Sequence, residues 1–187
     1  MKLANETKQV IFRINESKQE LKSVRSLVGI ALLTTLNVVA GTFNIQIAPT
    51  LQIGFSSVFA AACGMIFGPV PTALAGIIAD HLKFFIHPTG PYFIGFPINE
   101  FLIGFIYGCF FYKTEISLKR TICARAVITI FINLTLTSLW LNIMYQSPIF
   151  TKIRLIKNIV MFPFDVAILY FILKIFNNVY HKINYRH

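Results

Sequence analysis

Three carboxylate side chains lie inside strongly apolar stretches of this chain: Asp80, Glu100 and Asp165. An ionised side chain at the centre of a bilayer costs about 2.5–3.5 kcal/mol on insertion scales, so such a residue marks a candidate site. A carboxylate accepts hydrogen bonds from paired N–H donors, and Arg or Lys can hold a carboxylate of a bound molecule. The chemistry indicated is therefore the recognition of a small polar solute.

Other residues with suitable chemistry are expected at the same depth as Asp80 and Glu100, while Asp165 is expected to lie deeper. Asp80 lies about six residues before the break at 87–94, and Glu100 lies about five residues after it. Trp140 precedes the next break, which Arg154 and Lys157 follow. A helix rises about 1.5 Å per residue, so these positions all fall in the outer third of a membrane. This pattern predicts a cavity for a flat, polar, partly anionic molecule, with acidic groups inside it, cations at its rim and aromatic rings between them.

Each of these residues also has a purely structural interpretation. Asp80 and Lys83 are i,i+3 neighbours and would neutralise each other on one helix. Glu100 would favour the positive N-terminal end of its helix as a cap. The remaining alternatives are an interfacial anchor for Trp140, lipid-headgroup contacts for Arg154 and Lys157, helix packing for Asp165, and ordinary helix-end positions for His81 and His87.

The composition places the chain in a membrane. Hydrophobic residues make up 56% of the 187 residues and charged residues only 13%, whereas a soluble domain keeps roughly 25% charged residues. The net charge of +10 does not indicate a nucleic-acid partner, because the basic residues lie in short gaps between apolar runs instead of on one soluble face.

The sequence carries no motif for catalysis or metal binding. It has no Gly-x-x-x-x-Gly-Lys-Ser/Thr loop, so we do not expect it to hydrolyse ATP itself. Its cysteines, Cys63, Cys109 and Cys123, form no Cys-x-x-Cys pair. We therefore predict no enzyme activity, no catalytic residue, no metal site and no cofactor. A solute binder without an ATPase requires a partner that supplies the energy.

Six apolar runs predict an all-α membrane protein with six transmembrane helices. Each run is close to the roughly 20 residues that cross a hydrocarbon core, and backbone groups in lipid must be paired within a helix. We expect a basic N-terminal segment at 1–25, a transmembrane substrate-binding domain at 26–176 and a tail at 177–187. The predicted spans are Ser26–Phe43, Leu51–Phe67, Pro69–Ile86, Gly95–Tyr112, Ala126–Tyr145 and Leu155–Phe176.

The distribution of Lys and Arg predicts the orientation of these spans. Thirteen basic residues lie in or beside the segments on the side of the two termini, which include the N-terminal segment and the basic loop Lys113–Arg125. Four lie in or beside the segments of the other side. Since cytoplasmic loops carry the excess of positive charge, both termini are predicted to be cytoplasmic. Glu16 and Glu20, with lysines between them, indicate a short helix at the membrane surface within the N-terminal segment.

Two of the outer segments are expected to cover the cavity. Asn44–Phe55 alternates apolar and polar residues without charge, which is more typical of an extended flap than of a solvated loop. Pro91, Tyr92 and Phe93 place aromatic rings above the fourth span. Both segments supply stacking surface for a planar ligand.

Several stretches resemble the folate-specific S-components of energy-coupling-factor (ECF) importers. They are ELKSVRSLVGIALLTTLNVV (20–39), GMIFGPVPTALAGIIAD (64–80), FIHPTGPYFIGF (85–96), TSLWLNIMY (137–145) and RLIKNIVMFP (154–163). The similarity runs in order over residues 20–176. It implies a six-helix subunit of a prokaryotic plasma membrane that captures folate or a reduced folate from outside. Its partners would be a transmembrane coupling subunit and two cytoplasmic ATPase subunits.

The resemblance also gives the candidate residues specific roles. Docking on the coupling subunit would use small residues of the first span, here Ala31 and Thr35, where the family has a second alanine. Thr35 remains small, and its hydroxyl can be satisfied on its own helix. For the ligand, the resemblance implies that the pterin ring stacks near Trp140, Tyr92 and Phe55, and that Asp80 or Glu100 accepts hydrogen bonds from the pterin. The glutamate tail would contact Arg154, Lys157 or Lys152. Gln52 and Asn158 would add further hydrogen bonds.

Two other interpretations of the sequence remain open at this point. The first is an S-component for another vitamin, such as riboflavin or thiamin. The second is a structural or assembly membrane protein in which the polar groups only hold helices together.

Overall fold

The computed structural model describes the backbone of residues 2–43, 45–48, 51–53, 55–88, 90–146 and 152–184. The side chains of 2–8, 45–48, 51–53, 152–154, 180, 181, 183 and 184 fall outside the described set. The chain forms two compact units, one of Met1–Asn44 with Gly54–Thr114 and one of Ile45–Ile53 with Glu115–His187.

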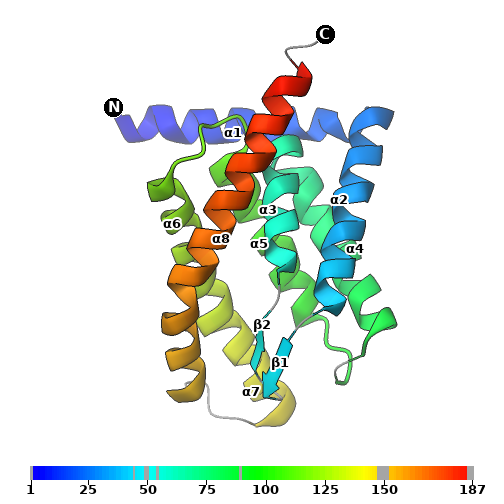
Figure 1. Ribbon diagram of the computed structural model, residues 1–187, viewed down its shortest axis with the longest axis vertical. Helices are drawn as coiled ribbons and strands as arrows, with labels where there is room; N and C mark the ends of the chain where they lie inside the picture. The colour runs from blue at the N-terminus through cyan, green and yellow to red at the C-terminus, as the bar shows by residue number, and fades with distance from the viewer. Residues whose placement is uncertain are drawn as a thin grey trace. The chain divides into compact units, whose positions relative to one another are not determined.

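The first unit is helical throughout its described part (Figure 1). Four of its helices pack against one another, while the first helix runs across one end of this packed group, crosswise to α2 (Figure 1). The surface helix predicted within the N-terminal segment is therefore present as a helix. The elements are α1 (Lys2–Glu20), α2 (Val24–Thr42), α3 (Ser56–Phe67), α4 (Pro69–Ile86) and α5 (Gly95–Phe111).

The predicted tight turn between the second and third apolar runs is confirmed. α3 ends at Phe67 and α4 begins at Pro69, whose ring suits the first turn of a helix. Gly68 joins them with φ of +86°, a backbone conformation that L side chains rarely adopt. A Cβ atom there would also lie 2.5 Å from the Cβ of Ser17, so both the conformation and the space require glycine.

Helices α4 and α5 approach each other through glycines on both sides. A Cβ atom on Gly76 would lie 2.5 Å from the carbonyl oxygen of Glu100, and one on Gly104 would lie 2.5 Å from that of Thr72. At Gly108 the added atom would lie 2.3 Å from the Cα of Pro69. Small residues allow such close backbone approach, and van der Waals packing is the main attraction between helices in lipid.

The second unit contains a two-stranded antiparallel sheet and a long interrupted helix. Strands β1 (Ile45–Ala48) and β2 (Leu51–Ile53) pair Ile45 with Ile53. The extended character predicted for this segment is confirmed at Ile45–Ala48 and Leu51–Ile53, and the part of the chain that the structure describes holds no other strand. The second apolar run begins its helix at Ser56 instead of Leu51, because Leu51–Ile53 belongs to β2.

The other elements of the second unit are α6 (Leu118–Val127), η1 (Ile128–Leu136), α7 (Thr137–Tyr145) and α8 (Lys152–Asn184). The first three form a continuous helix whose middle third, η1, has the wider π-helical hydrogen bonding. Thr135 fits this winding, since its hydroxyl donates to the carbonyl of Ile130, five residues earlier, at 2.8 Å.

The basic loop predicted at Lys113–Arg125 is largely wrong, because α6 begins at Leu118. Arg125 lies inside this helix with a mostly buried side chain and forms an ion pair with Asp165 of α8. Its burial is possible because the carboxylate supplies the opposite charge. Asp165 is thus a helix-packing group, as its alternative interpretation proposed.

Three helical stretches of the described chain are long and apolar enough to cross a membrane: Val24–Thr42, Leu118–Tyr145 and Leu155–Val179. The stretches Ser56–Phe67 and Gly95–Phe111 are apolar but shorter. The helical membrane class is therefore supported, while the count of six spans stays a prediction.

We predict that Gly104→Ala destabilises the first unit, because the new methyl group meets rigid backbone at Thr72. Overpacking of this kind costs about 1–3 kcal/mol. The melting temperature of the detergent-solubilised protein should fall by several degrees. Gly41→Ala is the matched control, since the atoms it meets belong to the flexible side chain of Lys83. Equal losses for both variants would contradict a rigid α4–α5 contact.

Candidate functional site

Two of the predicted carboxylates face each other across the glycine contact of α4 and α5. Gly76, which touches the backbone of Glu100, lies four residues before Asp80 and hence on the same face of α4. Both carboxylate side chains are half-buried. The close approach of the two helices therefore holds two acids near each other in apolar surroundings.

Lys83 lies between α2 and α5 beside these carboxylates. Its Nζ is 3.7 Å from Oε1 of Glu100, and its aliphatic stem lies against Gly41 of α2. The predicted neutralisation of Asp80 by Lys83 is incomplete, since the ion pair of Lys83 is with Glu100. The capping role for Glu100 is wrong, because this residue lies beyond the first turn of α5.

Asp80 has weaker interactions with its neighbours than Glu100, which has the ion pair with Lys83. Its titratable neighbours are Lys83, Glu100 and His81, but none of the described residues forms a hydrogen bond or an ion pair with its carboxylate. A half-buried carboxylate without such a partner is costly. A bound N–H donor would offset this cost.

Tyr92, in the loop after α4, contacts that helix through a hydrogen bond and a ring contact. Nδ1 of His81 is 2.7 Å from the carbonyl oxygen of Ile77, and a carbonyl only accepts, so Nδ1 carries the proton. In the neutral ring Nε2 then accepts from the hydroxyl of Tyr92 at 2.9 Å. Phe84 contacts the Tyr92 ring edge-on at 5.1 Å between centroids. The loop aromatic is therefore held beside the helix that carries Asp80.

Two polar residues of the first unit were missed by the sequence analysis. His81 was assigned an ordinary helix-end position, although its i,i+3 spacing to Phe84 already placed both on one face of α4. Asn37 of α2 was not considered. It is 4% exposed, and its Oδ1 has no hydrogen-bond partner among the described residues. An amide inside an apolar run was the signal that could have found it.

The remaining candidates of the first unit are exposed. Phe55 precedes α3 and is 45% exposed. Ala31 and Thr35 lie on the outer face of α2, and the Thr35 hydroxyl donates to the carbonyl of Ala31 at 2.9 Å. The expectation that Thr35 satisfies its hydroxyl on its own helix is confirmed.

The second unit carries the other six ligand candidates. Trp140 is half-buried on α7, and Lys157 and Asn158 are half-buried on α8. The backbone of Gln52 lies in β2 and that of Arg154 in α8, while both side chains, like that of Lys152, are outside the described residues. The structure thus brings Asp80, Glu100 and Tyr92 into one cluster of the first unit. In the second unit, Trp140 lies on α7, while Lys157 and Asn158 lie on α8.

Comparisons with known proteins agree on one class of protein. The family described as ECF-type riboflavin transporter, S component, matches residues 21–182. The chain is 35% identical over 152 residues to the folate transporter FolT of Clostridium novyi (strain NT), covering 80% of this chain and 88% of that one. It is 29% identical over 157 residues to FolT of Leuconostoc mesenteroides subsp. mesenteroides, covering 80% and 84%. A crystal structure of FolT bound with folic acid matches with a TM-score of 0.76 and 34% identity, covering 82% of this chain and 98% of that one.

We predict that Lys83 and Glu100 are energetically coupled. Lys83→Met should lower the melting temperature by several degrees because it leaves a half-buried carboxylate without its cation. Glu100→Gln should also lower it. The double variant should lose less than the sum of the two, which is the signature of a direct interaction. Additive losses would mean that the 3.7 Å pair contributes nothing to stability.

Proposed function

We infer the function from one premise: the chain belongs to the family of ECF-type riboflavin transporter S components. It is accordingly a membrane transporter subunit and not an enzyme. We propose that it captures folate or a reduced folate outside the cell and delivers it across the membrane as the S-component of an ATP-driven importer.

The choice of folate depends on the similarity to the FolT proteins. The relative from Clostridium novyi is 35% identical over most of both chains, and the solved structure that matches 82% of this chain is that of FolT bound with folic acid. The family description names riboflavin, so riboflavin is the second candidate. The individual relatives favour folate over it.

The carboxylate cluster of the first unit suits the pterin part of folate. The aminopyrimidine edge of a pterin offers adjacent N–H donors, and a carboxylate accepts two such bonds at once. We assign this role first to Asp80, because Lys83 already pairs with Glu100. The buried amide oxygen of Asn37 is a further acceptor in the same unit. Tyr92, with Phe55 at the exposed start of α3, offers aromatic surface for stacking.

The glutamate tail of folate requires cations, and the candidates for them lie on α8. We propose that Arg154 and Lys157, with Lys152 nearby in the sequence, bind its carboxylates. Asn158 and Gln52 would add hydrogen bonds, and Trp140 would stack on the pterin ring. These assignments follow from residue type and sequence position.

The same proposal includes the membrane arrangement and the partners. We propose six spans within residues 26–176, a cytoplasmic segment at 1–25, a cytoplasmic tail at 177–187 and a location in the plasma membrane. The excess of Lys and Arg on one side of the predicted spans supports this orientation. The partners proposed are a transmembrane coupling subunit, which docks on the α2 face that contains Ala31 and Thr35, and two ATPase subunits.

Folate should quench the fluorescence of Trp140, the only tryptophan of the chain, at micromolar or lower concentration. Asp80→Asn should weaken this binding by about 10-fold or more, since hydrogen bonds to charged groups contribute about 1.5–3 kcal/mol. Glu115→Gln, which removes an exposed carboxylate elsewhere, should leave binding unchanged. An unaltered spectrum on adding folate would favour the structural interpretation, and tighter binding of riboflavin would favour the second candidate.

A second prediction separates the two ends of the ligand. Arg154→Ala should weaken folate far more than a pterin that lacks the glutamate, because only folate has the carboxylates that a guanidinium would hold. The measurement is the ratio of the two dissociation constants in wild type and variant. An equal loss of affinity for both ligands would contradict a contact between Arg154 and the glutamate tail.

A further inference from the structure

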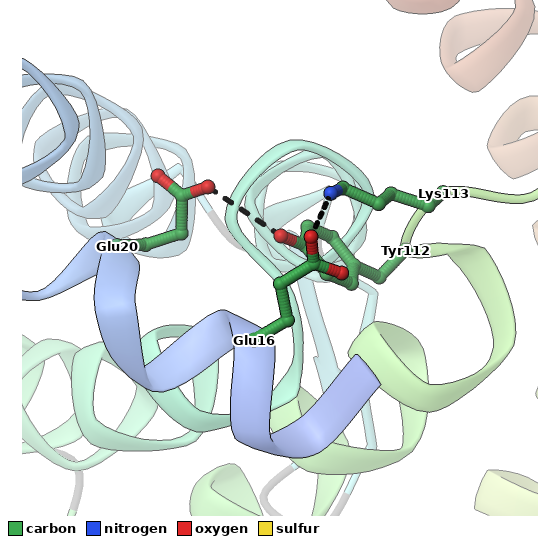
Figure 2. Close-up of polar contacts among 4 residues, drawn as sticks. All are labelled: Glu16, Glu20, Tyr112 and Lys113. Atoms are coloured by element: carbon green, nitrogen blue, oxygen red, sulfur yellow. Dashed lines mark hydrogen bonds and ion pairs between the residues drawn. The ribbon is translucent and has the colours of Figure 1, made fainter. Parts of the chain in front are cut away.

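The charged residues of α1 are sorted between its two faces. Both carboxylates between residues 13 and 25 are engaged with the body of the first unit (Figure 2). Lys113 lies 2.5 Å from Glu16, and the hydroxyl of Tyr112 donates to Glu20 at 3.4 Å. Ser26, at the start of α2, donates to the other oxygen of Glu20 at 2.6 Å. The negative charges of this segment are therefore turned inward and paired.

The rotation of α1 about its own axis is fixed by Ser17. This residue is fully buried in the space left by Gly68, where a Cβ atom would collide with it. Its hydroxyl accepts from the backbone N–H of Val70 at 3.4 Å and donates to the carbonyl of Ile14 at 2.8 Å. The face that contains Ser17 consequently rests on the start of α4.

Three cations lie at the end of α1, in the turn after it and in the first turn of α2. Lys18, Lys22 and Arg25 are exposed, and the one hydrogen bond described for them joins Lys18 to the neutral side chain of Asn15 at 3.4 Å. Two large apolar residues of α1 are exposed as well, Ile11 by 54% and Phe12 by 68%. The outer surface thus combines positive charge with apolar side chains and lacks an exposed carboxylate between residues 13 and 25.

We propose that the exposed surface formed by α1, the turn after it and the start of α2 binds anionic phospholipid headgroups. Lys18, Lys22 and Arg25 contact the phosphates, while Ile11 and Phe12 enter the boundary between headgroups and acyl chains, as interfacial helices do. Each Lys or Arg near an anionic membrane surface contributes about fivefold in affinity. An acidic protein surface would also attract the cations, but the exposed phenyl and butyl groups favour lipid.

The test uses the full chain in lipid nanodiscs and measures hydrogen–deuterium exchange of the backbone amides of residues 9–20. Discs of phosphatidylcholine alone are compared with discs that also contain phosphatidylglycerol. We expect the anionic lipid to slow exchange in α1 by about fivefold or more, and high salt to reduce this effect because it screens exposed charges. Identical exchange of the wild type in both lipids would overturn the proposal.

Variants locate the effect on the proposed surface. The triple change Lys18→Gln, Lys22→Gln and Arg25→Gln should abolish the response to phosphatidylglycerol. Removal of three exposed cations elsewhere, Lys119→Gln, Lys174→Gln and Lys182→Gln, should preserve it. Loss of the response in both triple variants would indicate a general charge effect and contradict the proposal.

Two further measurements separate this proposal from its alternatives. Slowing of α1 exchange by soluble polyglutamate, without any response to phosphatidylglycerol, would assign the surface to an acidic polypeptide and overturn lipid binding. Folate titration of the same samples is read separately. Retained folate affinity in the cation-deficient triple variant shows that the lipid surface and the solute site are independent, so failure of one proposal leaves the other intact.

Discussion

The close approach of α4 and α5 is the constraint on which the first unit depends. Gly76 and Gly104 bring backbone of one helix against backbone of the other, which a single methyl group would prevent. This contact sets Asp80 opposite Glu100 and lets Lys83 reach the second carboxylate. Towards the other end of the helices, Gly108 lies against Pro69, beside the turn that receives Ser17. The carboxylate cluster and the contact that receives α1 thus depend on one helix pair.

Charges in apolar surroundings are handled by pairing in both units. Lys83 pairs with Glu100 in the first unit, and Arg125 pairs with Asp165 in the second. Each pair joins two helices, so the cost of burial is offset by an opposite charge from a neighbouring element. Asp80 is the exception among the described carboxylates of these apolar runs. The ligand role proposed for Asp80 depends on this exception, since the paired carboxylates already serve to join helices.

The sequence predicted those elements whose ends are marked by local chemistry. The bounds of α4 follow from Gly68 with Pro69 at one end and from His87 with Pro88 at the other. The π-helical winding of η1 could not be predicted. The pattern of hydrophobic residues does not distinguish a backbone N–H that bonds the carbonyl four residues earlier from one that bonds the carbonyl five residues earlier. Likewise, spacing paired Lys83 with Asp80, whereas the structure pairs it with Glu100. That contact depends on how two helices face each other, which no local pattern encodes.

The attachment of α1 has a consequence for the order in which the protein is assembled. Its partners lie far along the chain: Val70 is 53 residues beyond Ser17, and Lys113 is 97 residues beyond Glu16. The ribosome makes α1 before these partners: Val70 exists only once α4 has begun, and Lys113 only once α5 is complete. A helix made before α4 and α5 therefore takes its final place in the first unit only after both have been synthesised.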